Sequence, residues 1–312
     1  MILLRSFAKI NLGLEVTGKR KDGYHTLRTV FQTIDLSDDI ELREVNEPRF
    51  RLTGDHPRVA WDERNLVARA CRLVADNYRL ARGFDITVRK RIPPGSGLGG
   101  GSGNAAVMLI FLNQHFSLGI PLTRLIEMAA SLGADVPFFL FGGMALGEGI
   151  GEKLTPLPGM PPRPLVLFIP ALPVSTALAF SRFRLTKTRL TSKIDFFLKK
   201  GDFSVLENDL EKATFEIFPE IRKIKGKMMQ GGCELVQMTG SGSAVFGMGP
   251  RGQLDSLRAL LPGSTLTSTI SRNQYQERIG VWPSGKASAF GAEIRRFEYS
   301  RPSNYRVNDH ER

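Results

Sequence analysis

The chain has 312 residues, of which 42% are hydrophobic and 24% charged, so we expect an ordinary globular protein with a large core in one or two domains. The sequence predicts neither a disulfide framework nor a zinc site, because its two cysteines lie far apart and its four histidines lack metal-ligand spacing. It predicts no membrane span, because no apolar run is longer than residues 105–112, and we expect a cytoplasmic location without a signal segment. The net charge of +12 would suit nucleic acid, an acidic membrane or a polyphosphate, but the basic residues are spread over 19–21, 89–91, 182–193 and 222–227 without interleaved aromatic side chains; we interpret most as solvated surface and expect neither nucleic acid nor membrane as partner.

The first 52 residues are predicted to form strands. Apolar side chains share one face of the first strand, at Ala8, Ile10, Leu12 and Leu14. Residues 27–36 and 40–45 supply further extended runs. On the opposite face of the first strand, Lys9 and Asn11 lie about 7 Å apart along the chain, and on these residues alone the pair could simply be solvated.

A glycine-rich run lies between a strand predicted over residues 84–92 and a helix predicted over 104–116, with further helices over 65–80 and 122–132. Its residues are Pro93, Pro94, Gly95, Ser96, Gly97, Leu98, Gly99, Gly100, Gly101, Ser102 and Gly103. Glycine permits positive φ and close approach of the main chain, and the first N–H groups of a helix have no internal partner. Such a turn predicts an anion site, most often for phosphate, and the alternative is a flexible linker or a plain tight turn.

Two common phosphate-binding loops fit this run poorly. Gly95, Gly97 and Gly100 match the dinucleotide pattern G-x-G-x-x-G, but that fingerprint needs an acidic residue about 20 positions on, after a second strand, whereas residues 119–121 lead into another helix. A P-loop closes on Gly-Lys-Ser or Gly-Lys-Thr, and residues 101–103 contain no lysine. Neither the dinucleotide fingerprint nor the P-loop is therefore complete.

The second half of the chain follows residues 133–137, where we expect Gly133 at a helix C′ position and Val136 in extended geometry before Pro137. Prolines gather from about residue 155, which indicates a connection. The elements predicted beyond it are a strand at 165–169, helices around 176–184, 194–200 and 206–229, and a strand pair bracketing 254–261. A second loop of glycine and serine, residues 239–244, lies between apolar runs. Residues 281–312 lose the pattern and form a tail of unknown role, either disordered or outside the folded core.

Three motifs, in this order, resemble those of the GHMP kinases, the small-molecule kinases that include galactokinase, homoserine kinase and mevalonate kinase. They are SFAKINL at residues 6–12, PPGSGLGGGSGNAA at 93–106 and TGSGSAVF at 239–246. Within the family, residues 8–14, KRKDGYH at 19–25 and GADVPFF at 133–139 resemble the branch that phosphorylates 4-diphosphocytidyl-2-C-methyl-D-erythritol. The resemblance covers about residues 1–275. The family commonly has two serines after the triple glycine, and here Gly103 replaces the second.

This resemblance implies an α+β fold in two lobes with the substrates in the cleft between them. Residues 1–154 would form an N-terminal ATP-binding lobe similar to domain 2 of ribosomal protein S5. Residues 155–280 would form a ferredoxin-like, substrate-binding lobe. Periodicity alone predicts only a mixture of helices and strands.

The resemblance also implies the catalytic and ATP-binding residues. Asp135 would accept the proton of the substrate's 2-hydroxyl, and Lys9 would hold that carboxylate and the developing negative charge; a turn role for Asp135 is the alternative. ATP would rest its phosphates on the backbone of the glycine-rich run, with Mg²⁺ bridging them and Ser102 as a metal ligand. Asn65 would touch adenine, although asparagine is also common at helix N-termini without any ligand.

For the second substrate, the family pattern implies that Asn11 binds it and that Tyr24 and His25 recognise its cytosine. Phe180 would supply a second stacking face, and generic core packing explains this residue equally well. Gly240 and Ser241 would present backbone donors to the diphosphate, and the alternative is an ordinary hairpin turn.

The function implied is ATP-dependent phosphorylation of the 2-hydroxyl of 4-diphosphocytidyl-2-C-methyl-D-erythritol, in the non-mevalonate route to isoprenoid precursors. Its partners would be that cytidyl diphosphate and ATP, with Mg²⁺, and the chain would be a monomer or a weak homodimer. Two alternatives stay open: another GHMP kinase of homoserine or mevalonate type, and a nonenzymatic protein that binds RNA or nucleotides.

Overall fold

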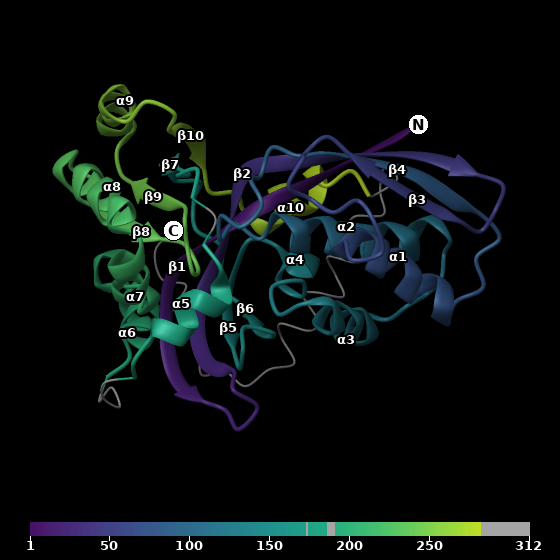
Figure 1. Ribbon diagram of the computed structural model, residues 1–312, viewed down its shortest axis with the longest axis horizontal. Coiled ribbons are helices and arrows are strands. Elements are labelled where there is room, and N and C mark those ends of the chain that lie inside the picture. Colours follow the sequence, from purple (N-terminus) through teal and green to yellow (C-terminus); the bar gives the residue numbers. More distant parts are fainter. Residues whose placement is uncertain (173, 186–190, 282–312) are drawn as a thin grey trace, which may run out of the picture.

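Two long antiparallel strands, β1 (Ile2–Lys19) and β2 (His25–Val45), run through both lobes of the molecule (Figure 1). The computed structural model describes residues 1–172, 174–185 and 191–281, so the predicted tail lies outside the described residues except for Val281. The two runs predicted at residues 27–36 and 40–45 are parts of the single strand β2. Ser37, Asp38 and Asp39 are polar but continue the strand, because they pair with β1.

The first sheet has the order β3-β4-β2-β5-β6, with β1 paired to β2. Its shorter strands are β3 (Phe50–Gly54), β4 (Gly83–Arg89), β5 (Met144–Glu148) and β6 (Lys153–Pro156). β3 and β4 are parallel, and every other pair in this sheet is antiparallel. The sequence predicted β4 but not β5 and β6.

Helices α1 (Leu66–Asn77), α2 (Gly100–His115), α3 (Leu122–Leu132) and α4 (Phe138–Phe141) share one core with the first sheet (Figure 1). α3 has the predicted bounds. α2 begins four residues before the predicted start at residue 104, so the end of the glycine-rich run is helical and not part of the turn. The prediction was wrong there because glycine has a low helix propensity, which hid the first turn.

The second lobe contains a four-stranded antiparallel sheet in the order β10-β7-β9-β8. Its strands are β7 (Pro164–Phe168), β8 (Leu235–Met238), β9 (Val245–Met248) and β10 (Thr265–Ser268). Helices lie between β7 and β8 and between β9 and β10, which is the β-α-β-β-α-β sequence of a ferredoxin-like fold. The ferredoxin-like prediction for this lobe is confirmed.

The helices of the second lobe are α5 (Thr176–Arg182), α6 (Lys193–Lys200), the 3₁₀ turn η1 (Phe203–Val205), α7 (Leu210–Ile217), α8 (Pro219–Gln230) and α9 (Arg251–Leu260). The single helix predicted over residues 206–229 is in fact two. Pro219 cannot continue a helix because it has no N–H to donate, and it begins α8 at the first helical position instead.

The last helix, α10 (Arg272–Arg278), returns to the first lobe. Tyr275 is fully buried in the first core, and its hydroxyl donates a hydrogen bond of 2.5 Å to the carbonyl of Phe139. Ile279 and Val281 pack in the same core. The boundary at residue 155 stays a prediction, and the chain crosses between the lobes again near its described end.

Among the helices within the described ranges, none combines the length and apolarity that crossing a bilayer requires.

Candidate active site

Lys9 and Asn11 lie in the middle of β1 and are both buried, with 3% and 2% of their surface exposed. Lys9 Nζ donates to Asn11 Oδ1 at 2.7 Å, forms an ion pair with Asp135 Oδ2 at 3.3 Å and lies 5.3 Å from the centre of the Phe31 ring. Asn11 Nδ2 donates to Thr29 Oγ1 at 2.8 Å. The solvated alternative for this pair is therefore wrong. A buried ammonium needs such partners, since burial without them is costly.

Asp135 lies in the turn between α3 and α4, and its side chain is about one-third exposed, at 35%. Its carboxylate therefore faces Lys9 from one side and is open to solvent on the other. α3 ends at Leu132 and Gly133 follows it, but with a φ of 172°, which is extended and not the left-handed conformation of a glycine at C′. The Val136 N–H donates to the Gly133 carbonyl at 3.1 Å, and the extended geometry of Val136 stays a prediction.

The first glycine loop, residues 93–103, holds Gly95, Gly97 and Gly99 in left-handed conformations, with φ of 73°, 80° and 71°. Gly99 is the N-cap of α2, and the Leu98 carbonyl accepts a bond from the Lys9 N–H at 3.0 Å. The loop and the first turn of α2, including Ser102, line a pocket of about 390 Å³. The unpaired amides at the start of α2 thus lie at a pocket, as an anion site requires.

A buried ion pair between Asp38 and Lys90, which sequence reasoning missed, lies beside the start of this loop. Asp38 Oδ1 accepts from the Arg91 and Ile92 N–H groups, both at 2.8 Å, while Asp38 Oδ2 pairs with Lys90 Nζ. Lys90 Nζ also donates to Asn104 Oδ1 at 3.1 Å. Lys90 is an exception to the interpretation of the basic runs as solvated surface. The sequence signal that could have revealed this pair is a carboxylate, Asp38, between two runs predicted to be extended.

The second glycine loop, residues 239–244, joins β8 to β9 as predicted and contacts both the first loop and β1. The Ala244 N–H donates to the Ser96 carbonyl at 3.1 Å. Thr239 Oγ1 donates to Asn11 Oδ1 at 3.1 Å and accepts from the Asn11 N–H at 3.0 Å. A Cβ added to Gly240 would stand 3.6 Å from Lys9 Nζ. The two glycine loops, Lys9, Asn11 and Asp135 therefore converge on one place.

Tyr24, His25 and Phe180 lie at the outer end of the β1–β2 pair. Tyr24 is exposed in the turn, and the His25 ring stacks on Phe180, with centroids 5.2 Å apart and planes at 22°. Phe183 meets His25 edge-on at 6.0 Å. Burial, and secondly the charge of Lys19, lower the pKa of His25 below 6.5. In this structure Phe180 stacks on His25 itself, so its role toward a base stays a prediction.

Ser241 contacts α5 of the second lobe, with its Oγ 3.0 Å from Thr176 Oγ1.

Asn65 is the N-cap of α1 and lines the pocket at the first glycine loop. Its Oδ1 accepts from the Val67 N–H at 3.0 Å, and its Nδ2 donates to the Ala60 carbonyl at 2.8 Å. The side-chain oxygen of Asn65 therefore caps the helix, and its amide nitrogen ties the helix start to the preceding loop. The adenine contact stays a prediction, and the capping alternative is observed.

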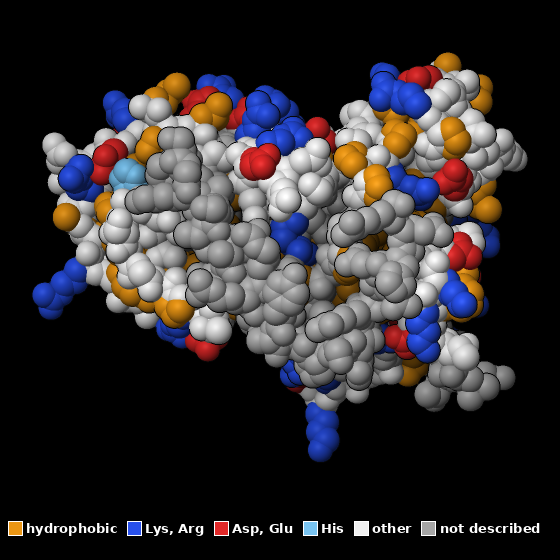
Figure 2. Space-filling view, turned by 180° about the vertical axis from the view of Figure 1, so that it is seen from behind, with side chains coloured by type: hydrophobic (Ala, Val, Ile, Leu, Met, Phe, Trp, Pro, Cys, Tyr) orange, Lys and Arg blue, Asp and Glu red, His pale blue; other side chains and the backbone are white. Residues whose placement is uncertain are grey.

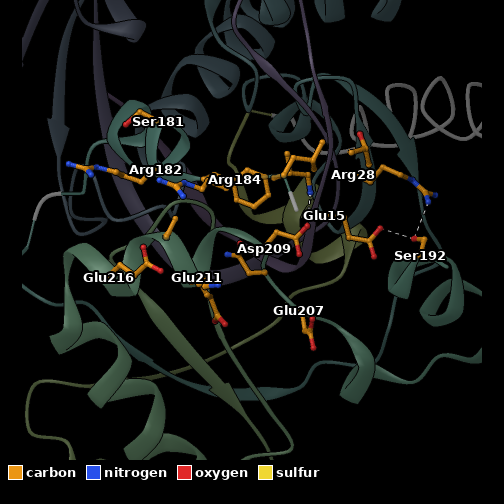
Figure 3. A pocket seen from close by; sticks show the side chains of 17 residues that line it. Glu15, Arg28, Ser181, Arg182, Arg184, Ser192, Glu207, Asp209, Glu211 and Glu216 are labelled. Atoms are coloured by element: carbon orange, nitrogen blue, oxygen red, sulfur yellow. Dashed lines mark hydrogen bonds between the residues drawn. The ribbon is translucent and has the colours of Figure 1, made fainter. Parts of the chain in front are cut away.

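A second pocket, of about 1090 Å³, lies beside the outer part of β1 and β2 and is highly charged (Figure 3). In the view of Figure 3, Arg182 and Arg184 lie on one side, and Asp209, Glu211 and Glu216 lie below them. Glu15 accepts from the Ser192 hydroxyl at 2.7 Å, so its carboxylate serves to fasten the start of α6. Burial is the main cause of the raised pKa of Glu211.

The basic residues of the described surface are divided among many ion pairs. Figure 2 shows Lys and Arg side chains at separate places on one face, with Asp and Glu among them. Exposed examples are Arg43 with Asp85 and Arg64 with Asp62, each at 2.7 Å. Such pairs contribute little to stability.

The described residues contain no group of three His, Cys, Asp or Glu side chains that could hold a metal by themselves. Two oxygen donors are available, namely the Ser102 hydroxyl, which lines the pocket at the first glycine loop, and the partly exposed Asp135 carboxylate beside Lys9. Such a set fits Mg²⁺, because this ion is usually held by one or two protein oxygens plus phosphates and water.

The chain is similar in sequence to proteins of one kinase family. Residues 65–143 match the description "GHMP kinases N terminal domain", and residues 198–261 match "GHMP kinases C terminal". A 4-diphosphocytidyl-2-C-methyl-D-erythritol kinase of Geobacter metallireducens is 41% identical over 249 residues, which cover 79% of this chain and 89% of that protein. The protein of the same name from Bacillus cytotoxicus is 37% identical over 253 residues, which cover 79% and 88%.

Solved structures give the same result. A crystal structure of 4-(cytidine 5'-diphospho)-2C-methyl-D-erythritol kinase matches with a TM-score of 0.74 at 34% identity, over 86% of this chain and 98% of that one. Homoserine kinase from Cytophaga hutchinsonii matches with a TM-score of 0.65 over 87% and 95% of the two chains. That match has 18% identity and bears on the fold alone. The predicted two-lobed α+β fold is confirmed.

Proposed function

The chain belongs to the GHMP kinase family, and from this premise we infer that it is the kinase that transfers a phosphoryl group from ATP to the 2-hydroxyl of 4-diphosphocytidyl-2-C-methyl-D-erythritol. The function predicted from the sequence is confirmed by relatives of that name at 37–41% identity and by the matching structure. This reaction belongs to the synthesis of isoprenoid precursors. The observation in the structure that carries the proposal is the convergence of two glycine loops on Lys9 and Asp135.

We propose that ATP places its phosphates in the pocket at the first glycine loop. The left-handed glycines bring main-chain amides to the surface, and the start of α2 adds the positive end of a helix dipole. Phosphoryl transfer is catalysed mainly by positioning and by stabilising charge on the transferring oxygens. Mg²⁺, when bound, would neutralise phosphate charge, with Ser102 as a protein ligand.

The acceptor hydroxyl would lie between Asp135 and the second glycine loop. The Asp135 carboxylate is held by Lys9 at 3.3 Å and still reaches solvent, so it can receive the hydroxyl proton as the oxygen attacks phosphorus. Lys9 Nζ, buried and hydrogen-bonded to Asn11, stabilises the negative charge that develops on that oxygen. The backbone of Gly240 and Ser241 would face the diphosphate of the substrate.

Cytosine would be recognised at the outer end of β1 and β2. His25 has one face on Phe180, so binding of a base between His25 and Phe180 requires these rings to separate, whereas exposed Tyr24 can close over a base without such a change. For this reason Tyr24 and His25 are the stronger candidates, and Phe180 follows them.

ADP release measured with and without the cytidyl substrate tests the function. We expect turnover that depends on this substrate, is inhibited by CDP in competition with it, and is at least tenfold faster than with homoserine or mevalonate. Turnover only with homoserine or mevalonate would favour another GHMP kinase activity. Nucleotide or RNA binding without substrate-dependent ADP release would favour the nonenzymatic alternative and sink the proposal.

We also propose that the protein is cytoplasmic, that it binds neither nucleic acid nor membrane, and that it is a monomer or a weak homodimer. Sedimentation at several protein concentrations checks the last of these.

A further inference from the structure

Residues 207–211 join β1 to the second glycine loop, and we call this segment the clamp. On one side it bonds to β1. The Leu14 N–H donates to the Glu207 carbonyl at 2.8 Å, the Asp209 N–H donates to the Leu14 carbonyl at 2.9 Å, and the Val16 N–H donates to Asp209 Oδ2 at 2.9 Å. The clamp is thereby fixed to the strand that carries Lys9.

On its other side the clamp holds the end of β8 and the loop that follows. Asn208 Nδ2 donates two bonds, to the Met238 carbonyl at 2.7 Å and to the Gly240 carbonyl at 2.8 Å. Glu211 Oε1 accepts from the Met238 N–H at 2.8 Å. The two carbonyls that Asn208 holds are separated by one residue, Thr239. The Asn208 side-chain amide therefore sets the path of the chain from Met238 to Gly240.

The Asn208 side chain is fully engaged and almost fully buried, with 4% exposed. Its Oδ1 accepts from the Leu210 N–H at 3.0 Å at the start of α7. A buried amide that donates to two carbonyls is costly to replace, because both would lose their donor and the buried Met238 carbonyl would remain away from water.

The residues that Asn208 fixes are those that meet the reacting groups. Thr239 Oγ1 bonds to both the side chain and the backbone of Asn11, which in turn holds Lys9 Nζ. Gly240 is left-handed, with a φ of 57°, beside the same ammonium. A displacement of about 1 Å at such a place can cost about a hundredfold in rate.

We propose that Asn208 is a positioning residue for phosphoryl transfer: through the clamp it sets the distance between the second glycine loop and Lys9. This inference rests on the proposed function. Asn208 acts through the carbonyls of Met238 and Gly240, and Thr239 between them bonds to Asn11 beside Lys9. The first glycine loop contacts the second, but it is also anchored at its start by Asp38, which bonds the Arg91 and Ile92 N–H groups, so ATP binding should depend less on Asn208 than phosphoryl transfer does.

The test compares Asn208→Ser and Asn208→Asp with the control Asn77→Ser. Serine and aspartate can both keep the cap on the Leu210 N–H, but neither has the amide donors. Asn77 is exposed, and its side chain donates to the Leu73 carbonyl one helical turn away. We expect kcat to fall by about tenfold to a hundredfold in both Asn208 variants, with KM for ATP within about twofold of wild type. Asn77→Ser should match the wild type.

Hydrogen exchange of a peptide spanning residues 239–244 gives a readout that does not require turnover. We expect faster exchange there in Asn208→Ser, while peptides from α1 and α2 keep their protection. Unchanged exchange at 239–244 would overturn the inference even if the wild type showed no kinase activity. A folded Asn208→Ser protein with wild-type kcat would also overturn it, whereas wild-type inactivity alone would count against the proposed function.

Should neither Asn208 variant fold, Thr214→Val offers a milder change to the same loop. Thr214 Oγ1 donates to the Ser241 carbonyl at 3.4 Å, and valine nearly keeps its shape. A fall in kcat of about threefold without a change in KM for ATP would support the inference. An unchanged kcat would contradict it.

Discussion

Lys9 shows how much a single side chain depends on parts of the chain that are far away in sequence. Its ammonium contacts Asn11 within β1, Asp135 in the turn after α3, and the ring of Phe31 in β2. The residue pattern predicted that Lys9 and Asp135 act together, because both lie in family motifs. It could not predict the burial of Lys9, since alternation along one strand does not reveal that the second glycine loop covers its polar face.

Replacing Asp135 by asparagine should lower kcat by about 10²- to 10⁴-fold, because the amide cannot take up the proton of the acceptor hydroxyl. Steady-state kinetics at saturating ATP and cytidyl substrate measure this. Asp76→Asn is the matched control, since Asp76 is exposed and pairs only loosely with Arg72 at 3.8 Å. Near wild-type turnover of Asp135→Asn would remove Asp135 as the base.

His25 should make the protein less stable in mild acid. Burial lowers its pKa below 6.5, so the unfolded chain binds the proton more readily than the folded one. The stability that neutral His25 contributes is therefore complete above pH 6.5 and is lost as the pH falls through the folded pKa. Between pH 7.5 and pH 5.5, Tm should fall more for wild type than for His25→Gln. Equal changes in Tm would mean that the histidine does not titrate differently on folding.

At the level of elements, the first glycine loop depends on contact with the second as well as on its own backbone. A Cβ at Gly97 would stand 2.3 Å from the Thr239 carbonyl oxygen, whereas a Cβ at Gly95 would meet nothing within 4 Å. Both glycines have positive φ, so alanine costs about 1–2 kcal/mol at either position from backbone strain alone.

Gly97→Ala should therefore lower both Tm and kcat much more than Gly95→Ala. Strain is common to the two variants, and only Gly97→Ala forces the two loops apart. Thermal melts and ADP release on the two proteins provide the comparison. Similar losses in both would show that conformation, and not loop contact, governs this segment.

The buried ion pair of Asp38 with Lys90 should contribute more to stability than the neighbouring exposed pair. Asp38→Asn leaves the Lys90 ammonium buried without a charge partner, which should reduce the free energy of unfolding by about 3–5 kcal/mol. Asp39→Asn next to it breaks only the pair with Arg91, which is 60% exposed, and should cost about 1 kcal/mol or less. Urea denaturation of both variants tests this. Equal costs would contradict the role assigned to the buried pair.

For the whole molecule, local sequence signals and family motifs were informative in different ways. Periodicity predicted α3 with its bounds, and β4 and β7 closely. The motifs supplied the two-lobed arrangement. Neither revealed α10, because a short amphipathic helix near the end of the described chain gives little sign that Tyr275 fills the first core. Pro219 itself marks the break between α7 and α8, whereas the longer apolar pattern predicts one helix across it.

A chain that ends at Val281 should keep wild-type Tm and turnover, whereas one that ends at Ile270 should not fold. The second lacks Tyr275, whose burial and hydrogen bond to Phe139 belong to the first core. Val281 is buried in the first core and is kept in the longer of the two chains, which lacks only residues 282–312. Expression and melting of the two shortened proteins test this. A large loss in the chain ending at Val281 would assign a role to residues 282–312.

The course of β1 has a consequence for how the molecule can come apart. Phe7 belongs to the first core, Ile10 to the core between the sheets and Leu14 to the core under the second sheet, all on one strand. Because β1 packs in all three cores, unfolding of either lobe removes packing partners from β1. Loss of β1 from one core in turn disturbs its packing in the other two. Heating should thus produce one calorimetric transition with matching van't Hoff and calorimetric enthalpies.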